Sequence, residues 1–306
     1  MFTKQSIKVE TQKRCATEML SLDTSHRREV MSQLCFDRIA QKQEFLTDKY
    51  HDTEDWNETA YYMLLRSLDI RKNRAMYERL ARLLPYRYLS KVSYDLRSVE
   101  ALLLGCAGFL PRLSIVFRDE DAISELCSIF EYNAHKFNLE RMRIEEWQLS
   151  GIKGDNHPVI RLLQLASVIS QHEHLLNDIL SCRTKADVEN LFCKSSIPQW
   201  ATRLLSDNSY SGAFTRTKAS MLGINVVAQI QILYSEYTMR RDLDSRGIEL
   251  LEQLPAESNL FISRWSKLGV KVDNALETQA LLQLSSLYCG NLECDRCPFR
   301  RFIDAE

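Results

Sequence analysis

The residues best suited to chemistry in this sequence are three cysteines near the C-terminus, Cys289, Cys294 and Cys297. They are spaced C-x4-C-x2-C and directly follow an amphipathic run that ends at Tyr288. Cysteine thiolates bind zinc and iron–sulfur clusters, and a gap of two residues lets both sulfurs of a pair reach one ion. The pattern therefore predicts a structural metal site, with zinc preferred over an iron–sulfur cluster. The alternatives are three thiols on a frayed chain end, or a disulfide that forms only on oxidation.

A closed metal site needs a fourth ligand, and this ligand must come from elsewhere in the chain. Residues 298–306 contain neither cysteine nor histidine. The fourth metal ligand could be Cys15, Cys182, Cys193 or a histidine, and the sequence does not decide among them. We take Cys15 as the candidate. A thioredoxin-like redox role for the C-x2-C pair is disfavoured, because that motif normally follows a strand of an α/β domain and no such unit is predicted.

Basic residues form a second candidate site, for an anion or for nucleic acid. Arg161 and Gln164 interrupt an otherwise apolar helical run, so Arg161 either binds an anion or marks a solvent-facing side. Residues 206–218 mix aromatic and basic side chains, including Arg216 and Lys218, and are predicted to form an exposed loop. Such a mixture suits single-stranded nucleic acid or phosphate, although exposed loops also acquire it by chance.

One acidic residue is also a candidate for a functional role. Glu100 adjoins the apolar run 101–104 and is expected to be partly buried, where a hydrogen bond between helices is more common than catalysis. The sequence contains no Walker loop, dinucleotide-binding glycine fingerprint, H-E-x-x-H motif or nucleophile elbow. We therefore do not predict enzymatic activity for this chain alone.

Helices must position these residues, because composition and periodicity favour an all-α fold. The chain has 306 residues, 45% of them hydrophobic, with only 9 glycines and 6 prolines, and its apolar residues recur at helical spacing. Asp55 and Asn73 are predicted N-caps, Pro158 a first-turn proline, and Gly269 a C-cap. Residues 228–232 alternate as in a strand, but the apolar pattern continues in helical register, so a helix is predicted there.

The predicted architecture is a multi-helix bundle with two packed lobes and a short C-terminal cysteine-rich tail. The turn-rich interval around Gly151, Gly154 and Pro158 is the predicted boundary between the lobes. This boundary gives an N-terminal helical lobe over residues 1–150 and a C-terminal helical lobe over residues 151–306, which ends in the cysteine-rich tail.

Charge and hydropathy narrow the choice of partners and location. The 40 basic and 41 acidic residues give a net charge of -1, so nucleic acid would have to be bound by a local patch. No run of roughly 18 apolar residues exists, and the first residues lack the apolar core of a secretory signal. Six cysteines scattered singly through helical patterns fit a reducing compartment. We expect a cytoplasmic protein with no membrane partner.

Several short phrases, read in order, resemble one protein family. The phrases are WNET (56–59), LARLLP (80–85), EALLLGCAG (100–108), IRLLQLA (160–166), LPAE (254–257), NA (274–275), QALLQL (279–284) and the tail Tyr288-Cys289 with Cys294 and Cys297. Together they resemble the bacterial family of domains of unknown function numbered 2851, which is common in Bacteroidetes. The resemblance runs from about residue 14 to the end of the chain.

The resemblance implies kinship rather than an activity. Family members look longer than this chain and have a strand-rich N-terminal part whose acidic residues are similar to a nuclease core. This chain resembles their helical C-terminal portion. A second likeness is to helix-hairpin-helix DNA glycosylases, whose C-x6-C-x2-C-x5-C loop is similar at its middle to Cys294–Pro298, although here the first gap is shorter and the last cysteine is absent.

From these observations we expect a non-catalytic binding module whose partner is a protein chain or nucleic acid. The predicted metal site would hold its last helix. The alternative is the helical portion of a nucleic-acid-processing enzyme, nuclease-like or glycosylase-like, whose catalytic part lies outside this chain.

Overall fold

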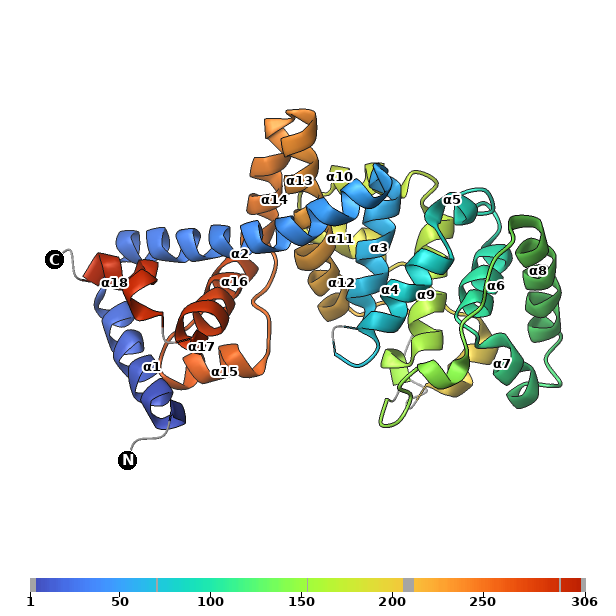
Figure 1. The fold of residues 1–306 in the computed structure, drawn as a ribbon, viewed down its shortest axis with the longest axis horizontal. Coiled ribbons are helices and arrows are strands. Elements are labelled where there is room, and N and C mark those ends of the chain that lie inside the picture. Colours follow the sequence, from blue (N-terminus) through green and yellow to red (C-terminus); the bar gives the residue numbers. More distant parts are fainter. Residues whose placement is uncertain (1–3, 70, 153, 206–211, 292, 304–306) are drawn as a thin grey trace. The chain divides into compact units, whose positions relative to one another are not determined.

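Helices make up the regular structure of the protein (Figure 1). The computed structural model describes residues 4–69, 71–152, 154–205, 212–291 and 293–303. Within these residues there is no strand, and the extended pairing is an isolated β-bridge between Pro255 and Asn274. The prediction of an all-α fold is confirmed.

The chain divides into two compact units. Unit 1 comprises Met1–Asp48 and Gln231–Glu306, and unit 2 comprises Lys49–Ile230. The predicted lobe boundary at residue 150 falls inside unit 2. The turn predicted there is present, with positive φ angles of 70° at Gly151 and 57° at Gly154, but it joins two parts of the same unit.

Unit 2 is built from consecutive helices of the middle of the sequence. Its helices are α3 (Trp56–Leu68), α4 (Arg74–Leu83), α5 (Tyr86–Leu89), α6 (Leu96–Cys106), α7 (Leu110–Val116), α8 (Asp121–Phe137), η1 (Ile144–Glu146), η2 (Gly154–Asn156), α9 (Pro158–Gln171), α10 (Leu175–Ser181), α11 (Lys185–Phe192), η3 (Gln199–Leu204), α12 (Arg216–Leu222) and the π-helix η4 (Gly223–Val227). The helix α13 (Ala228–Thr238) follows and continues into unit 1, so the predicted helix over residues 228–232 is confirmed.

The core of unit 2 lies around α6 and α9. Residues 99–106 of α6 and residues 158–169 of α9 are all buried. Gly105 of α6 faces Phe130 of α8, where an added Cβ would come within 2.1 Å of the phenyl ring. The close approach of α6 and α8 therefore depends on a residue without a side chain.

Local sequence signals set several helix ends as predicted. Asp55 accepts hydrogen bonds from two backbone N–H groups in the first turn of α3, Pro158 is the first residue of α9, and Gly269 has a φ of 89° just after α15 (Leu260–Lys267). Asn73 occupies the N-cap position of α4, but its side chain does not cap that helix. Instead it exchanges two hydrogen bonds with the backbone of Gln148, at 2.9 and 3.1 Å.

Unit 1 joins the two ends of the sequence. Besides α13 and α15, its helices are α1 (Lys4–Ser21), α2 (Thr24–Thr53, which continues into unit 2), α14 (Arg241–Gln253), α16 (Ala275–Gln283), the π-helix η5 (Leu284–Tyr288), α17 (Cys289–Asn291), η6 (Cys294–Arg296) and α18 (Pro298–Ile303). Helix α1 packs against α17, and α16 packs against both α14 and α15.

Side-chain hydrogen bonds tie the N-terminal helices of unit 1 to its C-terminal segment. The Tyr288 hydroxyl donates to Oδ2 of Asp37 in α2 at 2.9 Å, and Arg27 Nη2 donates to the Lys271 carbonyl at 2.7 Å. Both bonds join residues that are far apart in the sequence, so the first and last parts of the chain share one packed unit.

Among the described helices, no single one has the length and apolar character needed to cross a membrane. Helices α6 and α7 meet the criteria only when taken together, and the chain bends by 104° between them.

Candidate metal centre and buried cationic cluster

The structure brings Cys15 and the three C-terminal cysteines into the same unit. Cys15 lies in α1, and Cys289 begins α17 where the π-helix η5 ends. Cys294 begins η6, and the backbone N–H of Cys297 donates to the Cys294 carbonyl at 3.1 Å. Because α1 packs against α17, Cys15 and Cys289 lie on contacting helices that come from opposite ends of the sequence.

The electrostatics of these thiols reflects their proximity. Burial, together with smaller contributions from the charges of Cys297, Glu18 and Cys294, raises the pKa of Cys15 to about 11. Burial likewise raises the pKa of Cys289 to about 12, with further contributions from Cys15, Cys297 and Cys294. Since such influence weakens with distance, the four thiols share one neighbourhood.

The thiols do not stand in the arrangement of a closed metal site. Among the described residues, no three His, Cys, Asp or Glu side chains are placed so that they could hold a metal ion. No disulfide joins any of the described cysteines either. The two other cysteines considered as fourth ligands, Cys182 and Cys193, belong to unit 2. Metal binding would therefore require the side chains of the unit 1 cysteines to turn toward a common point.

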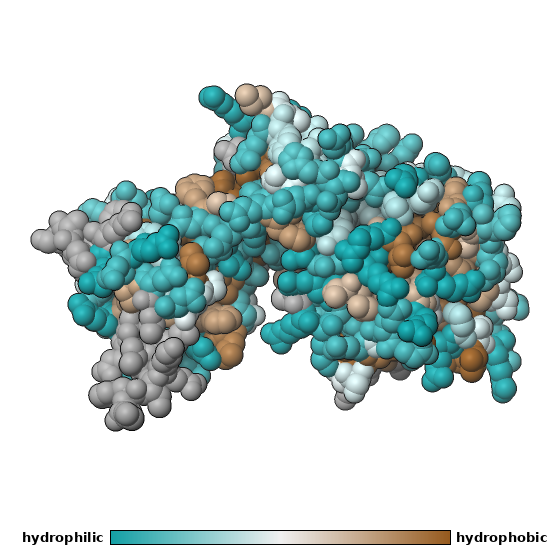
Figure 2. Space-filling model, viewed as in Figure 1, coloured by the Kyte–Doolittle hydropathy of each residue, from teal (hydrophilic) through white to brown (hydrophobic). Residues whose placement is uncertain are grey.

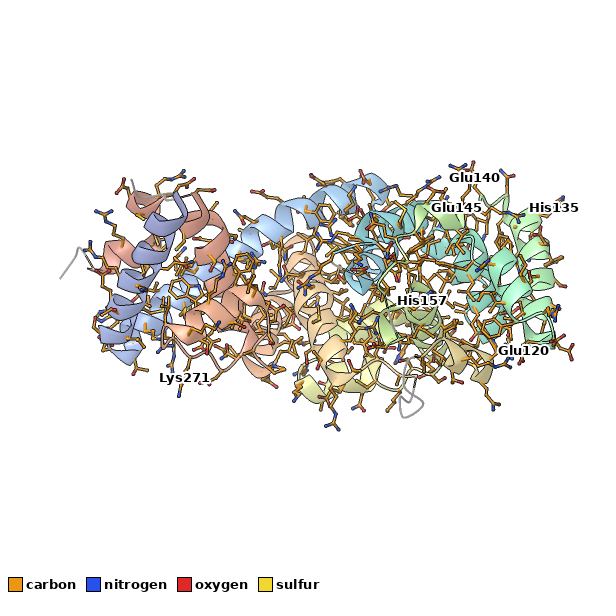
Figure 3. All side chains as sticks on the ribbon, turned by 90° about the horizontal axis from the view of Figure 1, so that it is seen from below. Glu120, His135, Glu140, Glu145, His157 and Lys271 are labelled. Carbon is orange, nitrogen blue, oxygen red and sulfur yellow. The ribbon has the colours of Figure 1, made fainter. Side chains whose placement is uncertain are left out.

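Arg161, a predicted anion contact, is buried at the start of α9. Its guanidinium donates to Gln164 Oε1 at 2.9 Å and to Asn156 Oδ1 at 2.8 Å, and it lies 3.4 Å from the carboxylate of Asp155. His157, the N-cap of α9, lies within unit 2 (Figure 3), and burial lowers its pKa. The guanidinium of Arg161 is therefore bound by residues of η2 and α9 of its own unit, and it does not face solvent.

Lys218 is also buried and belongs to helix α12, which corrects the predicted exposed loop over residues 206–218 at the C-terminal end of that segment. Its Nζ donates to the backbone carbonyls of Ser67 and Leu68, at 2.6 and 2.8 Å, and so caps the C-terminus of α3. Burial, together with the nearby charge of Arg161, lowers the pKa of Lys218 to about 7. Phe214 of the same segment is only 2% exposed, whereas residues 206–211 lie outside the described residues.

Arg216 is the exposed member of the three predicted basic contacts. Its Nε lies 3.6 Å from Glu189 Oε2, and its side chain is 84% exposed. The structure thus brings Arg161 and Lys218 together inside unit 2, but it does not gather all three residues into one basic surface. The prediction missed this because a polar stretch of sequence does not reveal which backbone carbonyls a lysine will reach.

Glu100 is buried in α6, as its apolar surroundings predicted. Its ion-pair partner is Arg97, one turn earlier in the same helix, at 3.5 Å, rather than a group on a neighbouring helix. Burial raises the pKa of Glu100 to about 7. The carboxyl group is therefore a source of pH-dependent stability in unit 2.

A polar network in unit 1 was not found from the sequence. Arg38 and Lys42, one turn apart on α2, both donate to Oε1 of Gln279 in α16, at 2.8 and 2.7 Å, and Nε2 of Gln279 donates to Glu257. Burial lowers the pKa of Lys42 to about 8. The available signals were the i, i+4 basic pair and a glutamine within an apolar run, and both are common on ordinary helix surfaces.

Comparison with known proteins places the chain in a family. The family described as Protein of unknown function (DUF2851) matches residues 2–260, which include Cys15 and the basic residues of unit 2. The match stops before Cys289, Cys294 and Cys297. Neither a curated protein nor a solved structure matches the chain. Because the match covers most of the sequence, this chain belongs to the DUF2851 family.

Proposed function

We propose that this chain is a non-catalytic binding module in which a structural metal ion, preferably zinc, holds the two ends of the sequence together. The ligands would be Cys15 from α1 and Cys289, Cys294 and Cys297 from the C-terminal segment. The observation that supports the proposal is that α1, which carries Cys15, packs against α17, which begins at Cys289, within the unit that also contains Cys294 and Cys297.

The chemistry of the four residues supports zinc as the ion. Four thiolates make a closed tetrahedral site with no open position for substrate, which is the pattern of structural rather than catalytic zinc. An ion there would cross-link helices from opposite ends of the chain. Since an unfolded chain rarely offers a preformed site, the free energy of binding would stabilise the fold of unit 1.

The test is the metal content of the purified protein, measured by elemental analysis after anaerobic preparation. We expect about one zinc ion per chain in the wild type and loss of that zinc in Cys15→Ala and Cys294→Ala. The matched control is Cys35→Ala, which removes a buried thiol of α2 in the same unit and should keep the metal.

Three outcomes would contradict the proposal. They are a wild-type protein without metal, variants that keep the metal, and a control that loses it. If the protein instead contains iron and absorbs visible light, the bound group is an iron–sulfur cluster rather than zinc. That result would strengthen the alternative function, in which the chain is the helical portion of a nucleic-acid-processing enzyme. That alternative has less support at present, because Arg161 and Lys218 direct their hydrogen bonds to the protein itself.

A further inference from the structure

A groove runs along one side of α2 in unit 1. Its volume is about 680 Å³. On the α2 side it is lined by Phe36, Ile39, Ala40, Gln43, Glu44, Thr47 and Asp48. The opposite side is formed by Ile232 and Glu236 of α13 and Ile248 of α14. Figure 2 shows hydrophobic residues gathered beside α14, above α2.

The α2 residues that line the groove follow the spacing of a single helix face. From Phe36 to Asp48 they recur every three or four positions. At a rise of 1.5 Å per residue this face is roughly 18 Å long. A surface of that length matches about three turns of a helix, and a helix laid in a groove is a recurrent mode of protein recognition.

The chemistry of the groove changes along its length. At one end Phe36, 48% exposed, stands beside the buried side chain of Ile39. Toward the other end α2 presents the exposed carboxylates of Glu44 and Asp48, and α13 adds Glu236. Among the described residues that line the groove, none is Lys, Arg or His. The groove therefore combines an apolar contact surface with one sign of charge.

We infer that this groove binds an amphipathic helix of a partner protein, with apolar side chains against Phe36, Ile39 and Ile248 and with Lys or Arg facing the three carboxylates. This inference rests on the proposed function of a binding module and names the chemistry of its partner. The carboxylates argue against nucleic acid as the occupant, because they would repel its phosphates. They favour a basic helix, since complementary charge steers association and sets the orientation of the bound partner.

The test uses the full chain and two labelled model peptides of about 14 residues, one of leucine and lysine and one of leucine and glutamate in the same helical pattern. Binding is measured by fluorescence anisotropy at moderate ionic strength. We expect the leucine–lysine peptide to bind and the leucine–glutamate peptide to bind at least about tenfold more weakly.

Variants locate the binding. Phe36→Ser, and separately Glu44→Lys with Glu236→Lys, should each weaken binding of the leucine–lysine peptide by about tenfold. The matched controls in unit 1 are Leu260→Ser, which alters a side chain that is 63% exposed, and Glu252→Lys, which alters an exposed carboxylate of α14. Both controls should bind as the wild type does.

Equal binding of the two peptides, wild-type affinity in the groove variants, or equal losses in the controls would overturn the inference. A wild-type dimer that dissociates in Phe36→Ser would also overturn it, because the occupant would then be a second copy of the chain. Metal content is measured on the same samples. Failure of peptide binding with zinc intact rejects the groove alone, whereas absence of zinc with peptide binding retained rejects the metal site alone.

Discussion

Units 1 and 2 are assembled from the sequence in different ways. Unit 2 uses one continuous stretch, and its central helices α6 and α9 are buried along most of their lengths. Unit 1 joins the first helices of the chain to the last ones, across the whole of unit 2 in sequence. Closing so long a loop has an entropic cost, so cross-links between the ends are expected to matter more in unit 1 than in unit 2.

The cationic side chains that are buried or partly buried in the two units also differ in what they bind. In unit 2, Lys218 binds backbone carbonyls directly and lies at the end of a helix. In unit 1, Arg38 and Lys42 both donate to the amide oxygen of Gln279, and the amide nitrogen of Gln279 donates to Glu257. In unit 2 the cation thus completes the end of a helix by binding its backbone carbonyls, whereas in unit 1 the cations are joined through a side-chain amide.

The largest expected effect is the selective opening of unit 1 when its proposed metal site is broken. In Cys15→Ala we expect the free energy of local opening at α1 and α17 to fall by about 3 kcal/mol or more, because the ion would no longer link the chain ends. Hydrogen exchange measured by mass spectrometry reports both units at once. The internal control is unchanged protection of the backbone amides of α6 and α9 from exchange. An equal loss of protection in both units would contradict the expectation that the metal stabilises unit 1 selectively.

An intermediate effect is expected in unit 2 for Lys218→Met. The substitution leaves the carbonyls of Ser67 and Leu68 without their donor and should lower stability by about 2–3 kcal/mol. Because the pKa of Lys218 is lowered to about 7 in the folded state, the folded protein binds fewer protons than the unfolded chain above that pH. The wild type should therefore gain stability as pH rises above 7, and the variant should lack this gain.

Urea unfolding at pH 7 and pH 9.5 measures both parts of the Lys218 prediction. The matched control is Lys185→Met in α11, where the ammonium group is half exposed and lies 3.7 Å from Glu189. If Lys185→Met lowers stability as much as Lys218→Met does, the loss does not depend on the hydrogen bonds that Lys218 makes to the end of α3. That result would contradict the prediction.

The smallest effect is expected for Glu100→Gln, and it is stabilising. The folded-state pKa of Glu100 is raised to about 7 from an ordinary value of 4.5, so the stability associated with its neutral form is lost as pH rises through 7. The neutral amide should raise the unfolding free energy at pH 8 by about 1–2 kcal/mol and leave it nearly unchanged near pH 4.5. Glu131→Gln, an exposed position of α8, is the control for unfolding measured at both values of pH. A gain that does not depend on pH would contradict the explanation by burial.

The sequence predicted local features well and distant contacts poorly. Asp55, Pro158 and Gly269 were correctly assigned to helix ends, because capping depends on residues within one turn. Asn73 was correctly assigned as an N-cap position, but its hydrogen bonds go to Gln148 in a distant loop. Lys218 was assigned to an exposed loop, since nothing in its neighbourhood in the sequence indicates the end of α3.

The candidate metal site combines both kinds of information. The spacing of Cys289, Cys294 and Cys297 is a local property, and it predicted thiols close enough to act together. Cys15 was one of several open choices for the fourth ligand. The packing of α1 against α17 is what separates Cys15 from Cys182 and Cys193, which lie in the other unit.

The sequence by itself determined that this chain is helical, where several helices begin and end, and that three cysteines near its C-terminus are spaced C-x4-C-x2-C. These properties depend on periodicity, capping and spacing over a few residues, which the sequence displays directly. Tertiary structure decided that the chain ends form one unit, that Lys218 is buried, and that one face of α2 lines a groove. Those outcomes depend on which apolar surfaces pack together, and side chains far apart in the sequence become neighbours only through that packing.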